Sequence, residues 1–189
     1  MSNRYEMRLS GSGGQGVILA SVIVADAAVR AGLQAVQSQS YGPEARGGMC
    51  KAETILSKGP IWFSKVTCPN FLLALTQAAF QKYSAVLAKD AVILADDSLT
   101  IPEGVSPDQV VQVPILATAR DRIGKAMTAN IVAVGAINRL LGLFSEDVLE
   151  EAVLSRVPKG TEALNQKALE EGRALISEEL AQRFRQSLS

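Results

Sequence analysis

Apolar and polar residues alternate over residues 5–10, which is the period of a strand with one buried face. A segment rich in Ala, Val and Ile follows over residues 17–31 and predicts a helix, which Gly32 is suited to close at its C-terminus. Residues 33–38 predict the next strand. Strand, glycine turn, helix and strand make one βαβ unit, and such units are nearly always right-handed.

The middle of the chain predicts further strands and one helix. Residues 49–57 alternate again, the continuous apolar run over residues 91–95 suits a buried strand, and residues 110–113 suit a short one. Asn70 is predicted to cap a helix over residues 71–83, in which apolar residues recur at roughly helical spacing.

The C-terminal third of the chain is helical by composition. Four helices are expected there, the last of them the most polar, over residues 115–124, 129–141, 145–157 and 161–188. No internal repeat, low-complexity tract or linker divides the chain. We therefore interpret residues 1–189 as one α/β domain.

Charge and composition exclude several classes of protein. The 189 residues carry 19 Lys and Arg against 19 Asp and Glu, so the chain lacks the basic footprint of a nucleic-acid-binding protein. It shows neither the apolar run of a signal peptide nor a stretch of ~18 uninterrupted apolar residues. We therefore expect a cytoplasmic protein that binds neither nucleic acid nor membrane.

The histidine and cysteine counts limit the chemistry further. The chain has no histidine, which excludes Ser-His-Asp and Cys-His catalysis and histidine-containing zinc sites. Its two cysteines, Cys50 and Cys68, cannot hold a cubane iron–sulfur cluster, which normally takes four thiolates. We expect both to be buried, reduced thiols.

Other conspicuous residues are interpreted as structural. Trp62 is expected either in a half-buried core position or as an interface anchor, because aromatic residues are enriched at interfaces. Asp96 and Asp97, at a strand end, suit a solvated turn better than a Mg²⁺ site. The four methionines, Met127 among them, are expected to fill gaps in the core.

A glycine-rich turn joins the first strand to the first helix, where Gly11, Gly13 and Gly16 satisfy G-x-G-x-x-G. Glycines let the backbone approach a ligand, and the N–H groups at a helix start attract an anion such as phosphate. An NAD site would also need an acidic residue after the second strand, where this chain has none. A purely structural turn, a phosphate-bearing ligand and NAD(P) stay open as interpretations. The candidate binding residues are Gly11, Gly13, Gly14, Gln15 and Gly16.

A second unusual loop spans Ser40–Gly48 and reads Ser-Tyr-Gly-Pro-Glu-Ala-Arg-Gly-Gly. The guanidinium of Arg46 is suited to hold a carboxylate or phosphate in a fork geometry. The alternative is an internal pair between Glu44 and Arg46 that stiffens the turn. The candidate binding residues of this loop are Tyr41, Glu44 and Arg46.

Taken together, the two loops and the helices that follow resemble one known family. Ala129-Asn130 opens an apolar helix that contains Gly135, and an Asn-Gln-Lys-Ala stretch at residues 165–168 precedes Gly172. This ordered set closely resembles the gamma subunit of 2-oxoacid:ferredoxin oxidoreductases, over residues 7–172. The second loop is most similar to that of the 2-oxoglutarate type.

Two positions depart from the pattern of this family. Phe63-Ser64 stands where the family commonly has an aromatic–proline pair, and Pro69-Asn70 stands where it commonly has Pro-Asp. Because Asn caps a helix as Asp does, we expect at most a local effect at the second position.

The resemblance implies a fold, a reaction and a division of labour. The fold is a single three-layer α/β/α domain with a mostly parallel or mixed sheet, similar to the gamma domain (domain III) of pyruvate:ferredoxin oxidoreductase. Enzymes of this family oxidatively decarboxylate a 2-oxoacid to an acyl-CoA, with coenzyme A as co-substrate, and pass the electrons to ferredoxin. Thiamine diphosphate, Mg²⁺ and [4Fe-4S] clusters are expected on the partner alpha and beta subunits, with a ferredoxin-like delta subunit as a further candidate. This chain alone is expected to bind none of these cofactors.

On this basis, the N–H groups of residues 13–16 are hypothesised to receive a phosphate of coenzyme A or to line its channel. Arg46 would hold an anionic group, with Glu44 orienting it. Asn130 would donate its amide to the same cleft, unless it is an ordinary polar residue of a first helical turn. Two rival functions stay open: a free-standing Rossmann-like nucleotide-binding oxidoreductase, and a purely structural subunit without ligand contacts.

Overall fold

A six-stranded mixed sheet lies at the centre of the computed structural model, which describes residues 4–39 and 48–187. Its strands are β1 (Arg4–Ser12), β2 (Gln34–Gln39), β3 (Met49–Ser57), β4 (Phe71–Ala74), β5 (Val92–Asp96) and β6 (Val110–Val113). They are arranged in the order β2-β3-β1-β4-β5-β6. The strands β1, β4, β5 and β6 are parallel, whereas β3 is antiparallel to both of its neighbours.

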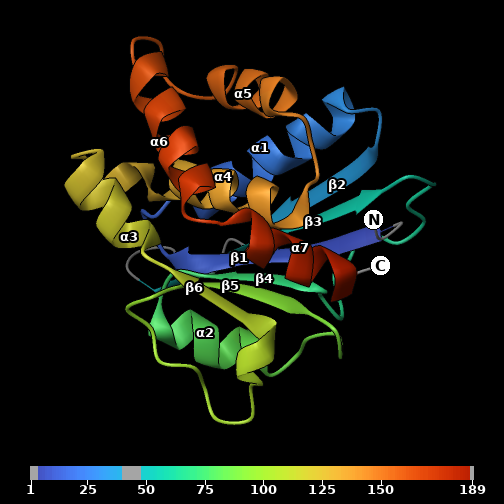
Figure 1. The fold of residues 1–189 in the computed structure, drawn as a ribbon. Helices are drawn as coiled ribbons and strands as arrows, with labels where there is room; N and C mark the ends of the chain where they lie inside the picture. Colours follow the sequence, from blue (N-terminus) through green and yellow to red (C-terminus); the bar gives the residue numbers. More distant parts are fainter. Residues whose placement is uncertain (1–3, 40–47, 188–189) are drawn as a thin grey trace.

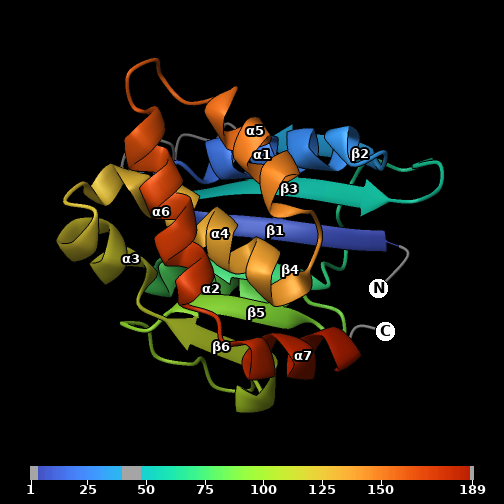
Figure 2. The same ribbon diagram turned by 45° about the horizontal axis from the view of Figure 1, so that its top comes forward.

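Helices cover the two faces of this sheet unequally. They are α1 (Val17–Arg30), α2 (Gln77–Ser84), α3 (Ile115–Ala117), α4 (Ala129–Leu141), α5 (Glu146–Leu154), α6 (Glu162–Ala174) and α7 (Glu178–Ser187). One face carries α1, α4, α5 and α6, whereas α2 lies on the other (Figure 1). Figure 2 shows α7 beside β6, at one edge of the sheet. The predicted single three-layer α/β/α domain is confirmed, with one thick and one thin helical layer.

The two strands of the predicted βαβ unit are present but are not neighbours. Helix α1 connects β1 to β2, and β3 then returns between them. It pairs with both in antiparallel register, so that Cys50 faces Gly11 and Ala52 faces Gln39. The strands β1 and β2 therefore run in the same direction, with β3 between them. Gly32, with a φ of +79°, closes α1 as the sequence predicts.

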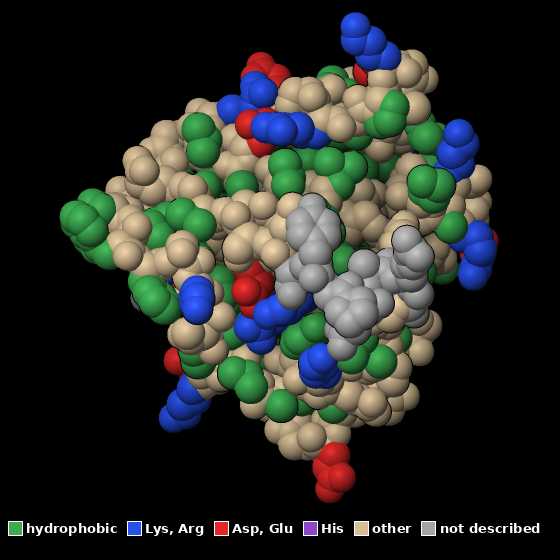
Figure 3. Space-filling model, turned by 180° about the vertical axis from the view of Figure 1, so that it is seen from behind, with side chains coloured by type: hydrophobic (Ala, Val, Ile, Leu, Met, Phe, Trp, Pro, Cys, Tyr) green, Lys and Arg blue, Asp and Glu red, His purple; other side chains and the backbone are tan. Residues whose placement is uncertain are grey.

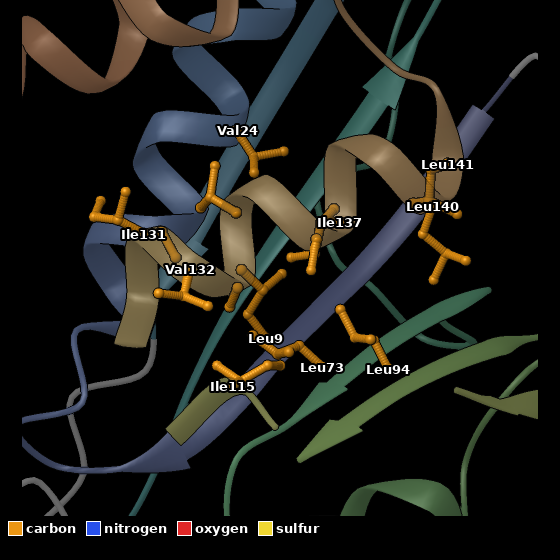
Figure 4. Packing of buried hydrophobic residues seen from close by; sticks show 14 of the residues in the cluster. Leu9, Val24, Leu73, Leu94, Ile115, Ile131, Val132, Ile137, Leu140 and Leu141 are labelled. Atoms are coloured by element: carbon orange, nitrogen blue, oxygen red, sulfur yellow. The ribbon is translucent and has the colours of Figure 1, made fainter. Parts of the chain in front are cut away.

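Helix α4 is the most deeply buried helix of the thick layer, because it lies between the sheet and α6. Its side chains Ile137 and Leu140 point toward the sheet, where Leu9 and Leu73 lie (Figure 4), and each of these four residues is at most 1% exposed. A helix that is apolar on nearly all sides needs such cover. Apolar as α4 is, no helix within the described residues is long and apolar enough to cross a membrane.

Two glycines let α4 and α6 meet backbone to backbone. A Cβ atom at Gly172 would collide with the carbonyl group of Val132, and one at Gly135 would collide with the carbonyl oxygen of Leu169. The collisions are reciprocal, so a side chain at either position would push the two helices apart. This contact gives a physical reason for both glycines in the sequence motif.

The prediction of a helix over residues 71–83 is wrong for the first half of this range. Phe71–Ala74 forms β4, a buried strand between β1 and β5. Helix α2 begins only after Thr76, whose Oγ1 caps it by accepting the N–H of Ala79 at 3.4 Å. Periodicity does not separate a short apolar run in a central parallel strand from a buried helix, since both lack a polar face.

Asn70 fastens β4 to β1 instead of capping a helix. Its Oδ1 accepts the N–H of Glu6 at 2.9 Å, and its Nδ2 donates to the carbonyl of Arg4 at 3.1 Å. The backbone N–H of Asn70 also donates to the carbonyl of Glu6, at 2.9 Å. An aspartate here would keep the acceptor and lose the donor, so the departure from Pro-Asp changes how the start of β1 is held.

The last predicted helix is two helices. Helix α6 ends at Ala174 and α7 begins at Glu178, after Ser177. The Oγ of Ser177 accepts the N–H of Leu180 at 3.2 Å, and Glu178 and Glu179 occupy the first turn, where negative charge is favoured. Ser-Glu-Glu is the helix start signal inside this polar stretch.

Several residues expected in the core lie at the surface. Cys68 is exposed and Cys50 is only partly buried, so the prediction of two buried thiols is wrong for Cys68. Met127 is 80% exposed and does not fill a gap in the core. Trp62 is 91% exposed, which removes the core alternative and leaves the interface one.

Asp96 is buried, contrary to the expected solvated turn, whereas Asp97 is exposed. The Oδ2 atom of Asp96 accepts the N–H of Leu116 at 2.7 Å. Its Oδ1 atom accepts the N–H of Ser98 at 3.1 Å and also the Ser98 hydroxyl. The carboxylate therefore joins the end of β5 to the start of α3.

We predict that Asn70→Ala lowers the free energy of unfolding by about 1–2 kcal/mol, because two backbone groups at the start of β1 lose their partner. Asn70→Asp should recover only part of this loss, since its carboxylate cannot donate to the carbonyl of Arg4. Urea unfolding of the three proteins measures the differences. Equal stability of all three would show that water replaces the side chain without cost.

Gly172→Ala should destabilise the protein by about 1–3 kcal/mol, although alanine is the better helix former by about 1 kcal/mol. The loss arises because the new methyl group collides with the backbone of α4. Thermal and urea unfolding measure it. Gly59→Ala is the control, because a Cβ at Gly59 meets no atom within 4 Å. An unchanged or raised stability of Gly172→Ala would contradict the close helix contact.

Candidate functional site

The glycine loop lies at the point where the chain connections diverge. From β1 the chain turns through α1 to the β2 side of the sheet, whereas from β4 it turns through α2 to the β5 side. In α/β proteins, ligands bind outside the carboxyl ends of the strands at such a switch point. The residues after β1 and β4 therefore form the candidate site.

Gln15 ties the ends of β1 and β4 together. Its side-chain Oε1 accepts the N–H of Ser12 at 2.7 Å, and its Nε2 donates to the carbonyl of Leu75 at 3.5 Å. Its backbone N–H donates to the carbonyl of Ser12 at 3.2 Å. A Cβ at Gly11 would collide with Oε1 of Gln15, so Gly11 makes room for this side chain. Both residues shape the loop, and their polar groups point inward.

Gly13 connects the glycine loop to the second motif. Its N–H donates to the carbonyl of Gly48 at 3.1 Å, immediately before β3. The last residue of the second motif thus lies against the first motif. Three other predicted residues of that motif, Tyr41, Glu44 and Arg46, lie outside the described residues.

Gly14 is the exposed residue of the loop and has a φ of +94°. A Cβ atom built there meets nothing within 4 Å, so this glycine serves the backbone conformation and leaves open space beside it. Helix α1 follows Gly16 with no side-chain cap and with no acidic residue in its first turn. Among the described residues, none accepts the N–H of Gly14 or Gly16. The positive end of α1 is therefore open toward Gly14.

Asn130 brings the start of α4 to the start of α1. It is 5% exposed, and its Nδ2 donates to the carbonyl of Gly16 at 3.4 Å. A Cβ at Gly16 would lie 2.6 Å from this same nitrogen, so Gly16 and Asn130 fit only because the loop residue is glycine. The predicted juxtaposition of Asn130 with the glycine loop is present in the structure. One N–H of its side-chain amide is therefore used to hold the loop.

Cys50 pairs with Gly11 across the sheet, next to the loop. Burial raises the pKa of its thiol, which makes it a weak nucleophile at neutral pH. Within residues 4–39 and 48–187, no three His, Cys, Asp or Glu side chains lie close enough to hold a metal ion.

Sequence reasoning missed Leu75, whose carbonyl receives Gln15, because β4 was interpreted as part of a helix. The signal available was the unbroken apolar run that ends in Thr76, a strong N-cap residue. A strand ending at such a cap places its last carbonyl at the carboxyl edge of the sheet, which is where the glycine loop lies.

Comparison with known proteins identifies the family. The pattern of the pyruvate ferredoxin/flavodoxin oxidoreductase family matches residues 6–175. This chain belongs to that family. The resemblance inferred from the sequence motifs is therefore confirmed.

Relatives within the family resemble this chain over most of its length. It is 42% identical to 2-oxoglutarate synthase subunit KorC of Methanocaldococcus jannaschii, over 93% of this chain and 95% of the relative. It is 31% identical to ketoisovalerate oxidoreductase subunit VorA of Methanothermobacter thermautotrophicus, over 78% of this chain but 31% of that longer protein.

Solved structures share the fold. The gamma subunit of a keto/oxoacid ferredoxin oxidoreductase from Geobacter sulfurreducens superposes with a TM-score of 0.81 and 48% identity, over 91% of this chain and 95% of the other. A 2-oxoglutarate:ferredoxin oxidoreductase from Magnetococcus marinus, solved with coenzyme A bound, gives a TM-score of 0.79 over 93% of this chain and 31% of the other. At 22% identity, the latter shows the fold alone.

The contact between Gly16 and Asn130 predicts non-additive mutations. Gly16→Ala should destabilise the chain by about 2–4 kcal/mol, from left-handed backbone strain and from collision with Asn130. Asn130→Ala should cost about 1 kcal/mol. In the double variant the two shortest contacts, with Nδ2 and Cγ of Asn130, disappear and only the 3.2 Å contact with the Cβ of residue 130 remains. The combined loss should therefore fall short of the sum by about 1 kcal/mol or more. Urea unfolding of the four proteins tests this, and strict additivity would contradict the contact.

Proposed function

We propose that this chain is the gamma subunit of a multi-subunit 2-oxoacid:ferredoxin oxidoreductase of the 2-oxoglutarate type. The observation that carries the proposal is the 42% identity to subunit KorC across nearly the whole of both chains. The match covers 93% of this chain and 95% of subunit KorC, which supports assigning this chain to the gamma subunit. The complex would decarboxylate 2-oxoglutarate oxidatively and form an acyl-CoA.

The reactive chemistry of this enzyme belongs to other subunits in this proposal. A cubane cluster takes four thiolates and this chain has two cysteines, so the residues present do not fit an iron–sulfur cluster. We assign thiamine diphosphate, Mg²⁺ and the clusters to the alpha and beta subunits, or to a ferredoxin-like delta subunit, with ferredoxin as the electron acceptor. The gamma subunit completes the complex and supplies no catalytic group of its own.

The glycine loop is the element we assign to coenzyme A. No described residue accepts the N–H groups of Gly14 and Gly16, and the start of α1 has no side-chain cap, so together they form a positive terminus that suits a phosphate group. Asn130 holds Gly16 in position through the hydrogen bond from its Nδ2 to the Gly16 carbonyl. The N–H of Gly13 donates to the carbonyl of Gly48 and that of Gln15 to the carbonyl of Ser12. The hypothesis that residues 13–16 donate to the ligand is therefore narrowed to Gly14 and Gly16. Arg46 stays the predicted holder of a further anionic group.

A free-standing dinucleotide-binding oxidoreductase is disfavoured by the sheet order. In that fold the second strand lies beside the first, and its terminal carboxylate reaches the ribose. Here β3 lies between β1 and β2, and β2 ends in Gln39. The second strand is thus one position too far from the glycine loop and carries no acidic residue at its end.

The coenzyme A assignment predicts a charge effect at one end of α1. Gly14→Asp should raise the KM for coenzyme A of the assembled enzyme roughly tenfold or more, because like charges ~8 Å apart near a surface repel by about 2 kcal/mol. Gly14→Asn, which tolerates the same backbone angle, should raise it far less. Steady-state ferredoxin reduction with 2-oxoglutarate and varied coenzyme A measures both.

Gly32→Asp is the matched control, because Gly32 has a similar positive φ and equally open surroundings at the other end of the same helix. It should leave the KM for coenzyme A unchanged. An equal rise in KM for Gly14→Asp and Gly32→Asp would show that backbone strain causes the effect, and would favour a purely structural subunit. A wild-type chain that fails to support 2-oxoglutarate oxidation with its partner subunits would overturn the subunit assignment itself.

A further inference from the structure

The connection between β3 and β4, residues 58–70, carries an exposed aromatic pair that the glycine-loop site does not use. We call it the β3–β4 arm. It projects past the strand ends near the N-terminus, on the right in Figures 1 and 2. Trp62 is 91% exposed and Phe63 is 57% exposed. Hydrophobic side chains project at the same end of the molecule when it is seen from behind, at the left margin of Figure 3.

The base of the arm is fixed to the domain, so the aromatic pair is presented on an ordered support. The N–H of Gly59 donates to the Ser57 hydroxyl at 3.1 Å, and the carbonyl of Phe63 accepts from the Arg4 guanidinium at 3.5 Å. Val66 is buried at 7% exposure, and the carbonyl of Pro69 accepts the N–H of Ala88 at 2.9 Å. An aromatic anchor held in place loses less entropy on binding than one on a free loop.

The charged side chains of the arm itself are all positive. Residues 54–89 contain four lysines and no aspartate or glutamate. Two of these lysines, Lys58 and Lys65, are exposed and flank the aromatic pair. A surface that complements the arm therefore needs an apolar pocket with carboxylates at its rim.

We propose that the β3–β4 arm anchors this chain in the enzyme complex, with Trp62 and Phe63 inserted into an acid-rimmed apolar pocket of another subunit. The inference rests on the proposed function, since it takes the chain to be a subunit. Binding hot spots are enriched in Trp and lie in desolvated pockets surrounded by polar contacts, which is the arrangement the arm offers.

A second copy of this chain offers the arm no suitable pocket between α4, α5 and α6. The cavity between α4, α5 and α6 has a volume of about 290 Å³ and is lined by three arginines and three glutamates, Arg139, Arg173, Arg185, Glu146, Glu150 and Glu170. Its rim therefore carries no net negative charge for Lys58 and Lys65. An arm alone also buries far less than the ~1,600 Å² of a standard interface, so it has to be one anchor within a larger contact.

The test measures association of this chain with the remaining subunits, prepared as a complex without it. Trp62→Ala should weaken binding roughly 30-fold, the effect of losing a hot-spot aromatic residue. The double charge reversal Lys58→Glu with Lys65→Glu should also weaken binding and should lessen its dependence on salt. Met127→Ala is the control, because Met127 is 80% exposed just before α4, whose first turn contacts the glycine loop at the other end of β1, and this variant should bind as wild type does.

Because Trp62 is the only tryptophan, 5-fluorotryptophan incorporated into this chain gives a single ¹⁹F resonance that reports on the arm. The resonance should shift and broaden when the unlabelled partner subunits are added. Circular dichroism and thermal unfolding of Trp62→Ala should match wild type, since an exposed side chain adds little to folding.

Each outcome decides the proposal. Wild-type affinity of Trp62→Ala, or a ¹⁹F resonance that ignores the partner subunits while the chain binds them, would overturn the arm as an anchor and leave the subunit assignment intact. Self-association of the isolated chain that depends on Trp62, measured by sedimentation, would assign the arm to a second copy instead. Failure of the wild-type chain to bind any of the other subunits would overturn the proposed function along with the arm.

Discussion

The backbone contact between α4 and α6 is the constraint on which the candidate site depends. Gly135 and Gly172 allow the two helices to approach so closely that α4 is enclosed between the sheet and α6. An enclosed helix cannot slide or rotate without opening the core, so its first turn is fixed in space. That first turn carries Asn130, which contacts Gly16. The packing of two helices thereby sets the position of the glycine loop.

The sequence predicts the elements best where its pattern has clear ends. The bounds expected for residues 49–57 and 129–141 are those of β3 and α4, because the first begins with alternating polar and apolar residues and the second ends at Gly142. The predictions are wrong where a stretch of uniformly apolar or uniformly polar residues spans the boundary between two elements. The apolar run into Thr76 hides a strand before a helix, and the polar run through Ser177 hides a break between two helices. Only cap residues mark those boundaries.

The sequence predicts where the glycine loop lies, but not which partner each of its residues contacts. Spacing identifies the glycine loop, and the structure then divides its residues by partners that are distant in the chain. Gly11 makes room for Gln15, which reaches Leu75, whereas Gly16 makes room for Asn130. No local pattern contains these pairings, because each depends on which strands become neighbours in the sheet. Gly14 is distinguished from the other loop glycines only by what surrounds it.

The two proposed functional elements lie at opposite ends of β1. The glycine loop follows Ser12, whereas the β3–β4 arm lies against Arg4, so the nine residues of β1 place them roughly 25–30 Å apart. That distance lets a subunit be held at one end while its other end faces a ligand. Under the two proposals the chain contributes through this placement, which suits a sequence with no histidine and only two cysteines.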